Sequence, residues 1–184
     1  AFAEHCTNGL SGNVVVIGLG AIGLSCAMLL HYHGCNVIGV DIQEHQLQTA
    51  KELCCDYVFN SRETDAAAAI RELLGGKRVD YVVDAVFNEW SLGFNQKILK
   101  KGGTMIEIGV PLADPKVNTL VLLCRELKLE TRYLYSEIDF LRAMEYRNGS
   151  CPSAFHRYCA IRADMKSENL RLQAEEPRST TSHK

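Results

Sequence analysis

The stretch VVVIGLGAIGLSCAMLL, residues 14–30, most narrows what this chain can fold into. A β-branched run that favours a strand leads into Gly18, Gly20 and Gly23, and then into an apolar run of helical length. Each glycine has its own steric role in such a turn. Gly18 permits the tight turn, Gly20 leaves room for a ligand to reach the backbone, and Gly23 lets the helix pack on the sheet. The sequence therefore predicts a turn whose backbone is open to a ligand.

The surroundings of this turn indicate which ligand it takes. The helix begins with unpaired amide groups and the positive end of its dipole, which suits a pyrophosphate. A second strand, residues 36–41, ends in Asp41, eighteen residues after Gly23. A carboxylate there can accept hydrogen bonds from both hydroxyls of an adenosine ribose. This context favours a dinucleotide, and the alternative is that the glycines and Asp41 have only structural roles.

Asp41 also bears on the kind of dinucleotide. A 2′-phosphate beside this carboxylate would be repelled by about 1 to 4 kcal/mol. Residues 42–45, IQEH, contain no arginine that could bind such a phosphate. The sequence therefore predicts NAD in preference to NADP.

Strand-like and helix-like segments alternate along the chain up to about residue 149. Apolar residues recur at helical spacing in residues 22–33, 47–53 and 66–73. Six short apolar runs are predicted to be strands, and they begin at Asn13, Asn36, Asp56, Val79, Gly103 and Leu127. Such strands joined by helices favour right-handed crossovers and a parallel sheet covered on both faces. The predicted fold class is α/β, a Rossmann-type doubly wound six-stranded parallel sheet in a single domain with an irregular C-terminal tail.

Two further features concern boundaries. Four glycines follow apparent helical runs and are expected to end them in a left-handed conformation: Gly75, Gly76, Gly102 and Gly103. Residues 150–184 contain two prolines, many Ser and Thr and few apolar residues in register, so they are predicted to be a polar, poorly ordered tail. Cys151, His156 and Cys159 match no standard zinc spacing, and accidental composition is the preferred interpretation.

Charge and hydropathy exclude several functions. A net charge of -2 without a dense basic run leaves no footprint for nucleic acid or an anionic membrane. No apolar run reaches the roughly 18 residues that span a bilayer, and AFAEHCTNGL lacks the pattern of a signal peptide. We therefore expect a cytoplasmic protein that binds neither nucleic acid nor membranes.

Five of the eight cysteines lie in or beside apolar segments and are expected to be buried free thiols: Cys26, Cys35, Cys54, Cys55 and Cys124.

Beyond the glycine turn, three segments closely resemble the cofactor domain of the medium-chain dehydrogenase/reductase family, the zinc-type alcohol, sorbitol and threonine dehydrogenase group. These segments are VVVIGLGAIGLSCAMLLHYHGCNVIGVDIQEHQLQTAKEL, VDYVVDAV and LKKGGTMIEIGVP, and the resemblance covers about residues 10–149. It implies a pyrophosphate turn formed by Gly18, Gly20, Ala21, Ile22 and Gly23, and a ribose site at Asp41 with Ile42 beside the adenine. It further implies that Val86 lines the adenosine site and that Ile108 and Val110 lie at the nicotinamide end.

The resemblance also implies a function. The chain is expected to be the NAD-binding domain of an oxidoreductase that moves hydride between nicotinamide and a secondary alcohol or its carbonyl. The family's catalytic zinc ligands correspond to positions upstream of residue 1, so no catalytic or metal-binding residue is assigned. Residues 1–10 resemble the helix that links the two domains, which leaves 11–149 as the Rossmann domain. We expect the chain alone to bind NAD without turnover, as a fragment or a truncated gene product.

Several points stay open at this stage. The family often pairs through its sixth strand, residues 127–135 here, so a homodimer is a further expectation. Two alternative functions are a non-catalytic NAD-binding or sensing module and a methyltransferase, although Gly23 and the run GGTMIEIGVP count against the latter. Two departures from the family pattern also matter. Cys54 stands where the family usually has glycine, which predicts left-handed strain, and Phe87 replaces a small residue and is expected to crowd the adenine side.

Overall fold

The computed structural model describes residues 12–134 and residue 137. Its strands are β1 (Asn13–Ile17), β2 (Asn36–Asp41), β3 (Tyr57–Asn60), β4 (Val79–Asp84), β5 (Leu99–Glu107) and β6 (Lys128–Thr131). Its helices are α2 (Ala21–Tyr32), α3 (Glu44–Leu53), α4 (Ala66–Leu73), α5 (Glu89–Ile98) and α6 (Thr119–Arg125). All six predicted strands are present, whereas α5 and α6 are additional to the helices that apolar spacing predicts.

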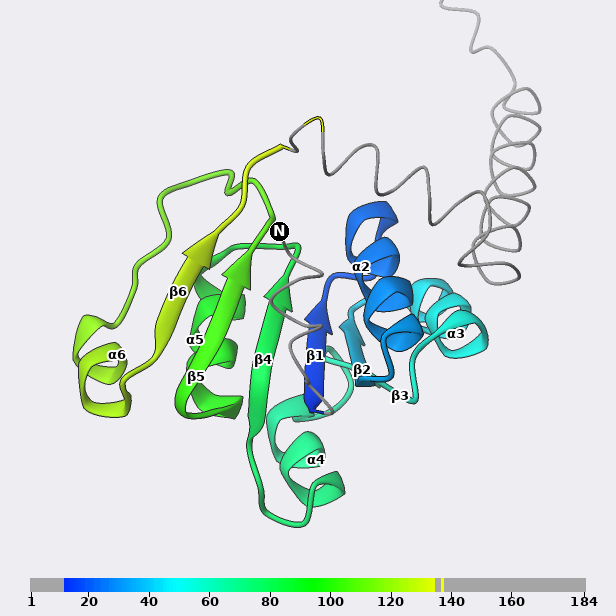
Figure 1. Cartoon of the computed structure of the whole chain (residues 1–184), viewed down its shortest axis with the longest axis horizontal. Coiled ribbons are helices and arrows are strands. Elements are labelled where there is room, and N and C mark those ends of the chain that lie inside the picture. The colour runs from blue at the N-terminus through cyan, green and yellow to red at the C-terminus, as the bar shows by residue number, and fades with distance from the viewer. Residues whose placement is uncertain (1–11, 135–136, 138–184) are drawn as a thin grey trace, which may run out of the picture.

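The six strands form one parallel sheet in the order β3-β2-β1-β4-β5-β6. Figure 1 shows the arrowheads of β1, β4, β5 and β6 pointing the same way, so the carboxyl ends of these strands lie at one end of the sheet. The order reverses between β1 and β4, and in a doubly wound sheet the crevice at that point is where ligands bind. The predicted fold class is confirmed for the described residues.

Helices cover both faces of the sheet, and strand alternation assigns each buried side chain to one face. Val14 and Val16 of β1 belong to a core cluster that α2 and α3 cover. Val15 and Ile17 belong to a second cluster, which includes residues of α4 and α5. All four side chains are at most 1% exposed. Burying each stabilises the sheet by about 1.5 to 3 kcal/mol, which explains why continuous β-branched runs occur here.

The predicted helix end is confirmed at Gly75 and Gly76 but is wrong at Gly102 and Gly103. Gly75 and Gly76 follow α4 with φ of 62° and 84°, as predicted for a helix end. Gly102, with φ of 73°, and Gly103, whose φ is not positive, both lie inside β5 instead. There the ladder to β4 is irregular, because Val79 pairs with Leu99 while Tyr81 pairs with Thr104. These glycines therefore lie in an irregular part of a strand and do not end a helix.

The structure shows the backbone conformation at the two departures from the family pattern, Cys54 and Phe87. Cys54 has φ of -164°, which is extended backbone, so the predicted left-handed strain is absent. Phe87 does adopt a left-handed φ of 51°. Its side chain is half-buried and packs against the second core cluster, and the crowding of the adenine side stays a prediction.

The expectation that five cysteines are buried free thiols is confirmed only in part. Cys54 and Cys55 are buried free thiols and Cys35 is buried, but Cys26 is half-buried and the free thiol Cys124 is exposed. In the described part of the chain, no helix is long and apolar enough to cross a membrane. The proposed linking helix, the tail at 150–184 and its cysteine and histidine group lie outside the described residues.

Candidate cofactor-binding site

The glycine turn lies at the carboxyl end of β1, and its three glycines meet different surroundings. Gly18 has φ of 79°, and a Cβ there would lie 2.7 Å from Val86 Cγ2. A Cβ on Gly23 would lie 1.8 Å from the carbonyl oxygen of Gly18, so only glycine allows α2 to approach the turn this closely. A Cβ on Gly20 would have no atom within 4 Å. The steric roles of Gly18 and Gly23 are therefore as expected, and the space at Gly20 is open.

The first turn of α2 lacks the partners that other helices have. Side chains cap α4, α5 and α6, namely Asp65, Asn88 and Asn118, and α3 has Glu44 in its first turn. Among the described helices, α2 alone has neither a capping side chain nor an acidic residue there. Its first amide groups and its dipole therefore remain available to an anion. Gly20, Ala21 and Ile22 are all exposed, so this end of α2 faces outward.

Asp41 lies beside this turn, at the end of β2. Its Oδ2 accepts a hydrogen bond of 2.6 Å from Leu19 N, inside the glycine turn. Its Oδ1 accepts from Ile42 N at 2.7 Å and from Gln43 N at 2.9 Å. These three backbone donors hold the carboxylate against the turn. Since each carboxylate oxygen has two acceptor sites, Oδ2 retains one for a further donor.

Three of the remaining predicted positions, Val86, Ile108 and Val110, follow β4 and β5, whereas Ile42 follows β2. Val86 follows β4, is 37% exposed and contacts the glycine turn, as the close approach to Gly18 indicates. Ile108 follows β5, is half-buried and packs against the first core cluster. Val110 is 74% exposed two residues further on, and Ile42, 43% exposed, follows Asp41. The structure thus brings together the glycine turn, Asp41 and Val86, while the side chain of Ile108 faces the core.

A buried polar cluster beneath the crevice was missed from the sequence. Asp84 ends β4, Glu107 ends β5, and the two are paired in the ladder. Asn95 of α5 donates from Nδ2 to Asp84 Oδ2 at 2.9 Å and to Glu107 Oε1 at 3.2 Å. Burial, together with the neighbouring Asp84, raises the pKa of Glu107 to about 9. The available signal was an acid at the end of each of two apolar strands, VVD and MIE.

A basic cluster was missed too, because its members are far apart in sequence. Arg71, Arg78, Lys97, Lys116 and Arg125 line a hollow of about 540 Å³. Arg78 and Arg125 donate to the carbonyl of Leu99, and Arg125 also donates to that of Gln96. These carbonyls lie at the end of α5, where cations complement the helix dipole. None of the ten residues that line this hollow is a predicted cofactor position.

Within the described ranges, no three His, Cys, Asp or Glu side chains are grouped so that they could hold a metal ion.

The doubly wound sheet, with a glycine turn at its switch point, places the molecule among Rossmann-type domains. A family model described as zinc-binding dehydrogenase matches residues 21–147. The chain belongs to this family, which confirms the resemblance to zinc-type medium-chain dehydrogenases.

Individual relatives agree with this assignment. An NAD-dependent alcohol dehydrogenase of Sulfurisphaera tokodaii is 31% identical over 138 residues, which cover 73% of this chain and 39% of that protein. Sorbitol dehydrogenase 1 of Saccharomyces cerevisiae is 30% identical over 138 residues, with coverages of 71% and 39%. The crystal structure of an alcohol dehydrogenase from Aeropyrum pernix superposes with a TM-score of 0.72 at 21% identity, covering 79% of this chain and 43% of that one, and supports the fold. The chain thus spans about two fifths of the length of the curated relatives it matches.

Proposed function

We propose that this chain binds NAD(H) at the carboxyl ends of β1, β2 and β4, as the cofactor-binding part of an alcohol dehydrogenase-like oxidoreductase. The observation that carries the proposal is the uncapped start of α2 with open space at Gly20, next to the Asp41 carboxylate. The pyrophosphate lies on the amide groups of Ala21 and Ile22, where the helix dipole favours negative charge. Bound NAD would supply the hydride acceptor of the reaction.

Each remaining position has a role in this proposal. Asp41 accepts hydrogen bonds from the adenosine ribose, and the exposed side chain of Ile42 lies beside the adenine. Val86 lines the adenosine side of the crevice. Ile108 contributes backbone groups at the nicotinamide end, because its side chain packs in the core, and Val110 lies nearby.

The preference for NAD over NADP is part of the proposal and rests on Asp41. Its Oδ2 is 2.6 Å from Leu19 N, so the negative charge is held at the glycine turn. A ribose 2′-phosphate at this place would meet that charge, at a cost of about 1 to 4 kcal/mol. A ribose 2′-hydroxyl would instead donate a hydrogen bond to it.

For the whole protein, we propose hydride transfer between nicotinamide and a secondary alcohol or its carbonyl. Relatives named NAD-dependent alcohol dehydrogenase and sorbitol dehydrogenase support this substrate class. Zinc, where the whole protein uses it, would act as a Lewis acid on the substrate oxygen, with ligands that we assign to the part of the relatives that this chain does not match.

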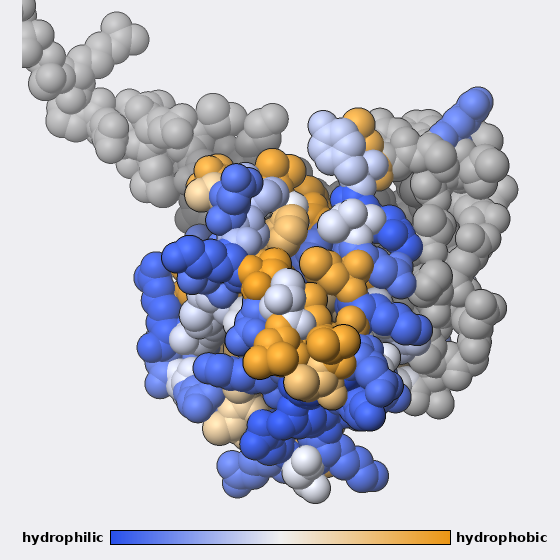
Figure 2. All heavy atoms as spheres, turned by 90° about the vertical axis from the view of Figure 1, so that its left-hand side faces the viewer, coloured by the Kyte–Doolittle hydropathy of each residue, from blue (hydrophilic) through white to orange (hydrophobic). Residues whose placement is uncertain are grey.

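A homodimer through β6 is a further part of the proposal. β6 is an edge strand of the sheet, and an edge exposes backbone groups that can pair with a second copy. Leu129 of β6 is 38% exposed, and Leu120 and Leu123 of the neighbouring α6 are 67% and 75% exposed. Figure 2, which looks onto this side of the molecule, shows apolar atoms gathered at its centre. This surface suits a self-complementary contact better than it suits water.

Fluorescence titration of the full chain with NADH tests the proposal. We expect saturable binding that Gly20→Val abolishes, because the branched side chain fills the open space in front of the amide groups. Circular dichroism of the variant should match that of the wild type. Absent binding, or binding that Gly20→Val leaves unchanged in a folded variant, would refute the site. Oxidation of alcohols by this chain alone would contradict the division of labour that we propose.

A further inference from the structure

The buried cluster of Asp84, Asn95 and Glu107 contains two carboxyl groups and no counter-charge. Asp84 and Asn95 are fully buried, and Glu107 is 1% exposed. None of the ion pairs found among the described residues involves either acid. Two adjacent carboxylates in such a core would repel each other strongly and would lack hydration.

The groups that face the two acids do not titrate. In the ladder, Ile17 of β1 lies beside Asp84 and Thr131 of β6 lies beside Glu107 on the same face of the sheet. Asn95 covers the two acids from α5, whose charged residues Glu89 and Lys97 are exposed.

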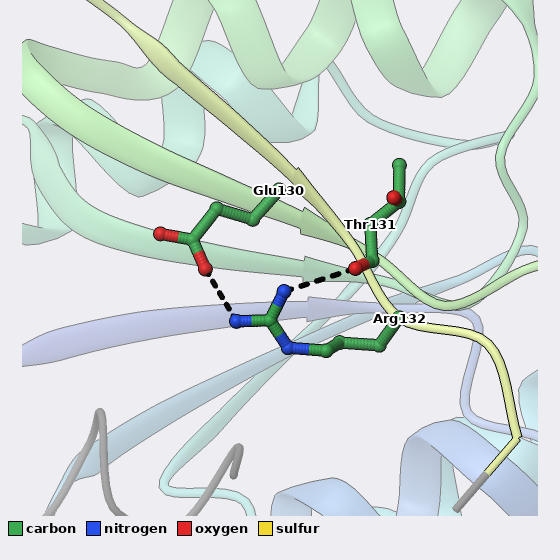
Figure 3. A network of polar contacts seen from close by, with 3 residues as sticks. All are labelled: Glu130, Thr131 and Arg132. Carbon is green, nitrogen blue, oxygen red and sulfur yellow. Dashed lines mark hydrogen bonds and ion pairs between the residues drawn. The ribbon is translucent and has the colours of Figure 1, made fainter.

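Other charged groups of the neighbouring elements point elsewhere. Figure 3 shows the guanidinium of Arg132 directed at Glu130 and at the carbonyl of Thr131, with contacts of 2.7 Å and 2.9 Å. Lys128 of β6 is exposed, as are Asp114 and Lys116 of the loop after β5. Arg125 of α6 donates to carbonyls at the end of α5. Among the described residues no cation faces the two acids, so a proton is the means of reducing their charge that this part of the chain offers.

The hydrogen bonds indicate which acid carries that proton. Asp84 Oδ1 accepts from Val86 N at 2.8 Å and from Phe87 N at 2.9 Å, and its Oδ2 accepts from Asn95. Three donors suit an ionised carboxylate. Glu107 Oε2 is buried without a partner among the described residues, and its Oε1 accepts only from Asn95 Nδ2, at 3.2 Å. A carboxyl group with few donors is cheaper to bury in its neutral form, so Glu107 is the acid that carries the proton and Asp84 is the ionised one.

Asp84 also connects the two loops that border the crevice. Its carboxylate holds the amides of Val86 and Phe87, while its carbonyl accepts from Ile108 N at 2.9 Å and from Gly109 N at 3.1 Å. The loops touch each other, because a Cβ on Gly109 would lie 2.8 Å from the carbonyl carbons of Ala85 and Val86. The left-handed backbone of Phe87 is unfavourable for a bulky residue and needs such support. Any movement of Asp84 therefore moves both loops.

We propose that Glu107, in its neutral form, is a positioning residue: without a charge it lies beside the ionised Asp84 without repelling it, and thereby holds the loops after β4 and β5 in the conformation that receives the cofactor. This inference rests on the proposed function. Loss of the proton leaves two facing carboxylates, which separate the ends of β4 and β5. Cofactor affinity is full while the proton is bound. It falls, by up to tenfold per pH unit, once the pH passes the pKa of about 9.

NADH titrations of the full chain from about pH 6 to about pH 10 test this proposal. We expect constant affinity in the wild type up to about pH 8 and a decline above about pH 9. Glu107→Gln should remove the decline, because its amide donates to Asp84 but does not titrate. Glu72→Gln, which removes an exposed acid of α4, should keep the profile of the wild type. A wild-type affinity that stays constant to pH 10, or a Glu107→Gln profile like that of the wild type, overturns the proposal.

Two measurements that do not use the cofactor separate this proposal from the function on which it rests. In carboxyl ¹³C NMR spectra of the glutamate-labelled wild type, one glutamate should titrate near pH 9. The free energy of unfolding should fall between about pH 4.5 and about pH 9, because the folded chain retains a proton that the unfolded chain releases. If no glutamate titrates above about pH 7, the neutral form of Glu107 is refuted. If the titration is present but no NADH binds at any pH, the coupling to the cofactor is refuted and the site proposal fails with it.

Discussion

Gly23→Ala should destabilise the fold, although alanine favours a helix. The added Cβ would lie 1.8 Å from the carbonyl oxygen of Gly18 and 3.4 Å from Ala85 Cβ. Ordinary contact with that oxygen requires about 1.5 Å more, and the obstacle is backbone that no rotamer change can move. α2 must therefore shift away from β1, which loosens buried side chains such as Leu24, Ala27 and Leu30.

Opposing terms set the size of this effect. Overpacking costs about 1 to 3 kcal/mol, and backbone contact places this case at the upper end. Alanine returns about 1 kcal/mol of helix propensity. The net loss is about 2 kcal/mol, which urea unfolding followed by circular dichroism measures directly. A Gly23→Ala chain as stable as the wild type would show that α2 does not need its close approach to Gly18.

Gly20→Ala provides the size-matched control, since a Cβ at residue 20 meets no atom within 4 Å. Alanine is a poorer N-cap than glycine, so the stability should fall by at most about 1 kcal/mol. NADH affinity should fall at least about tenfold, because the methyl group occupies the approach to the amide groups. The two variants thus separate the packing role of one glycine from the proposed binding role of the other. Equal effects of both on stability would refute this separation.

Two further predictions concern the cofactor and the partner. Asp41→Ser should weaken NADH binding by roughly 1.5 to 3 kcal/mol and raise the NADPH affinity relative to it; an unchanged ratio of the two dissociation constants would show that Asp41 does not reach the ribose. Leu129→Glu should shift the chain from dimer to monomer in sedimentation experiments, because a carboxylate cannot be buried unpaired in the contact. Tyr57→Glu, at the exposed first residue of β3 on the opposite edge of the sheet, should leave the dimer intact, and a wild type that sediments as a monomer would refute the interface.

The fold was predictable because period-2 and period-3.6 patterns coincide with the elements over most of the chain. The predicted run NVIGVD matches β2 residue for residue, and the predicted run NVVVIG exceeds β1 by one residue, Gly18. Patterning fails where an element is short or has mixed polarity. α6 has only seven residues and buries none of them, and α5 buries Ser91, Asn95 and Gln96 among its apolar residues. Both α5 and α6 therefore depend on tertiary packing. Their capping residues, Asn88 and Asn118, were the local signals in the sequence.

The candidate site was predictable where local backbone geometry dictates it. Gly18 and Gly23 are required by a positive φ and by a close approach, and the spacing of the motif encodes both. The hydrogen bond between Leu19 N and Asp41 depends on the pairing of β1 with β2. The sequence predicts that pairing only once the Rossmann-type fold has been inferred. The contact of Asp84 with Glu107 depends on the register of β4 and β5. That register includes an irregularity between Val79 and Tyr81, which no local pattern predicts.

Strain and buried polarity concentrate at the switch point of the sheet. Phe87, Glu126 and Leu134 are the non-glycine residues with positive φ among those described. Glu126 ends α6, an ordinary place for a left-handed residue, whereas Phe87 lies in the loop that faces the glycine turn. The amides of the same loop donate to Asp84. Its neighbour Glu107 is a neutral acid at a position where an apolar side chain would be cheaper to bury. A sheet built only for stability would not combine a bulky left-handed residue with two buried acids at one crevice. Their coincidence at the proposed cofactor edge is what a requirement for fixed loop geometry would produce.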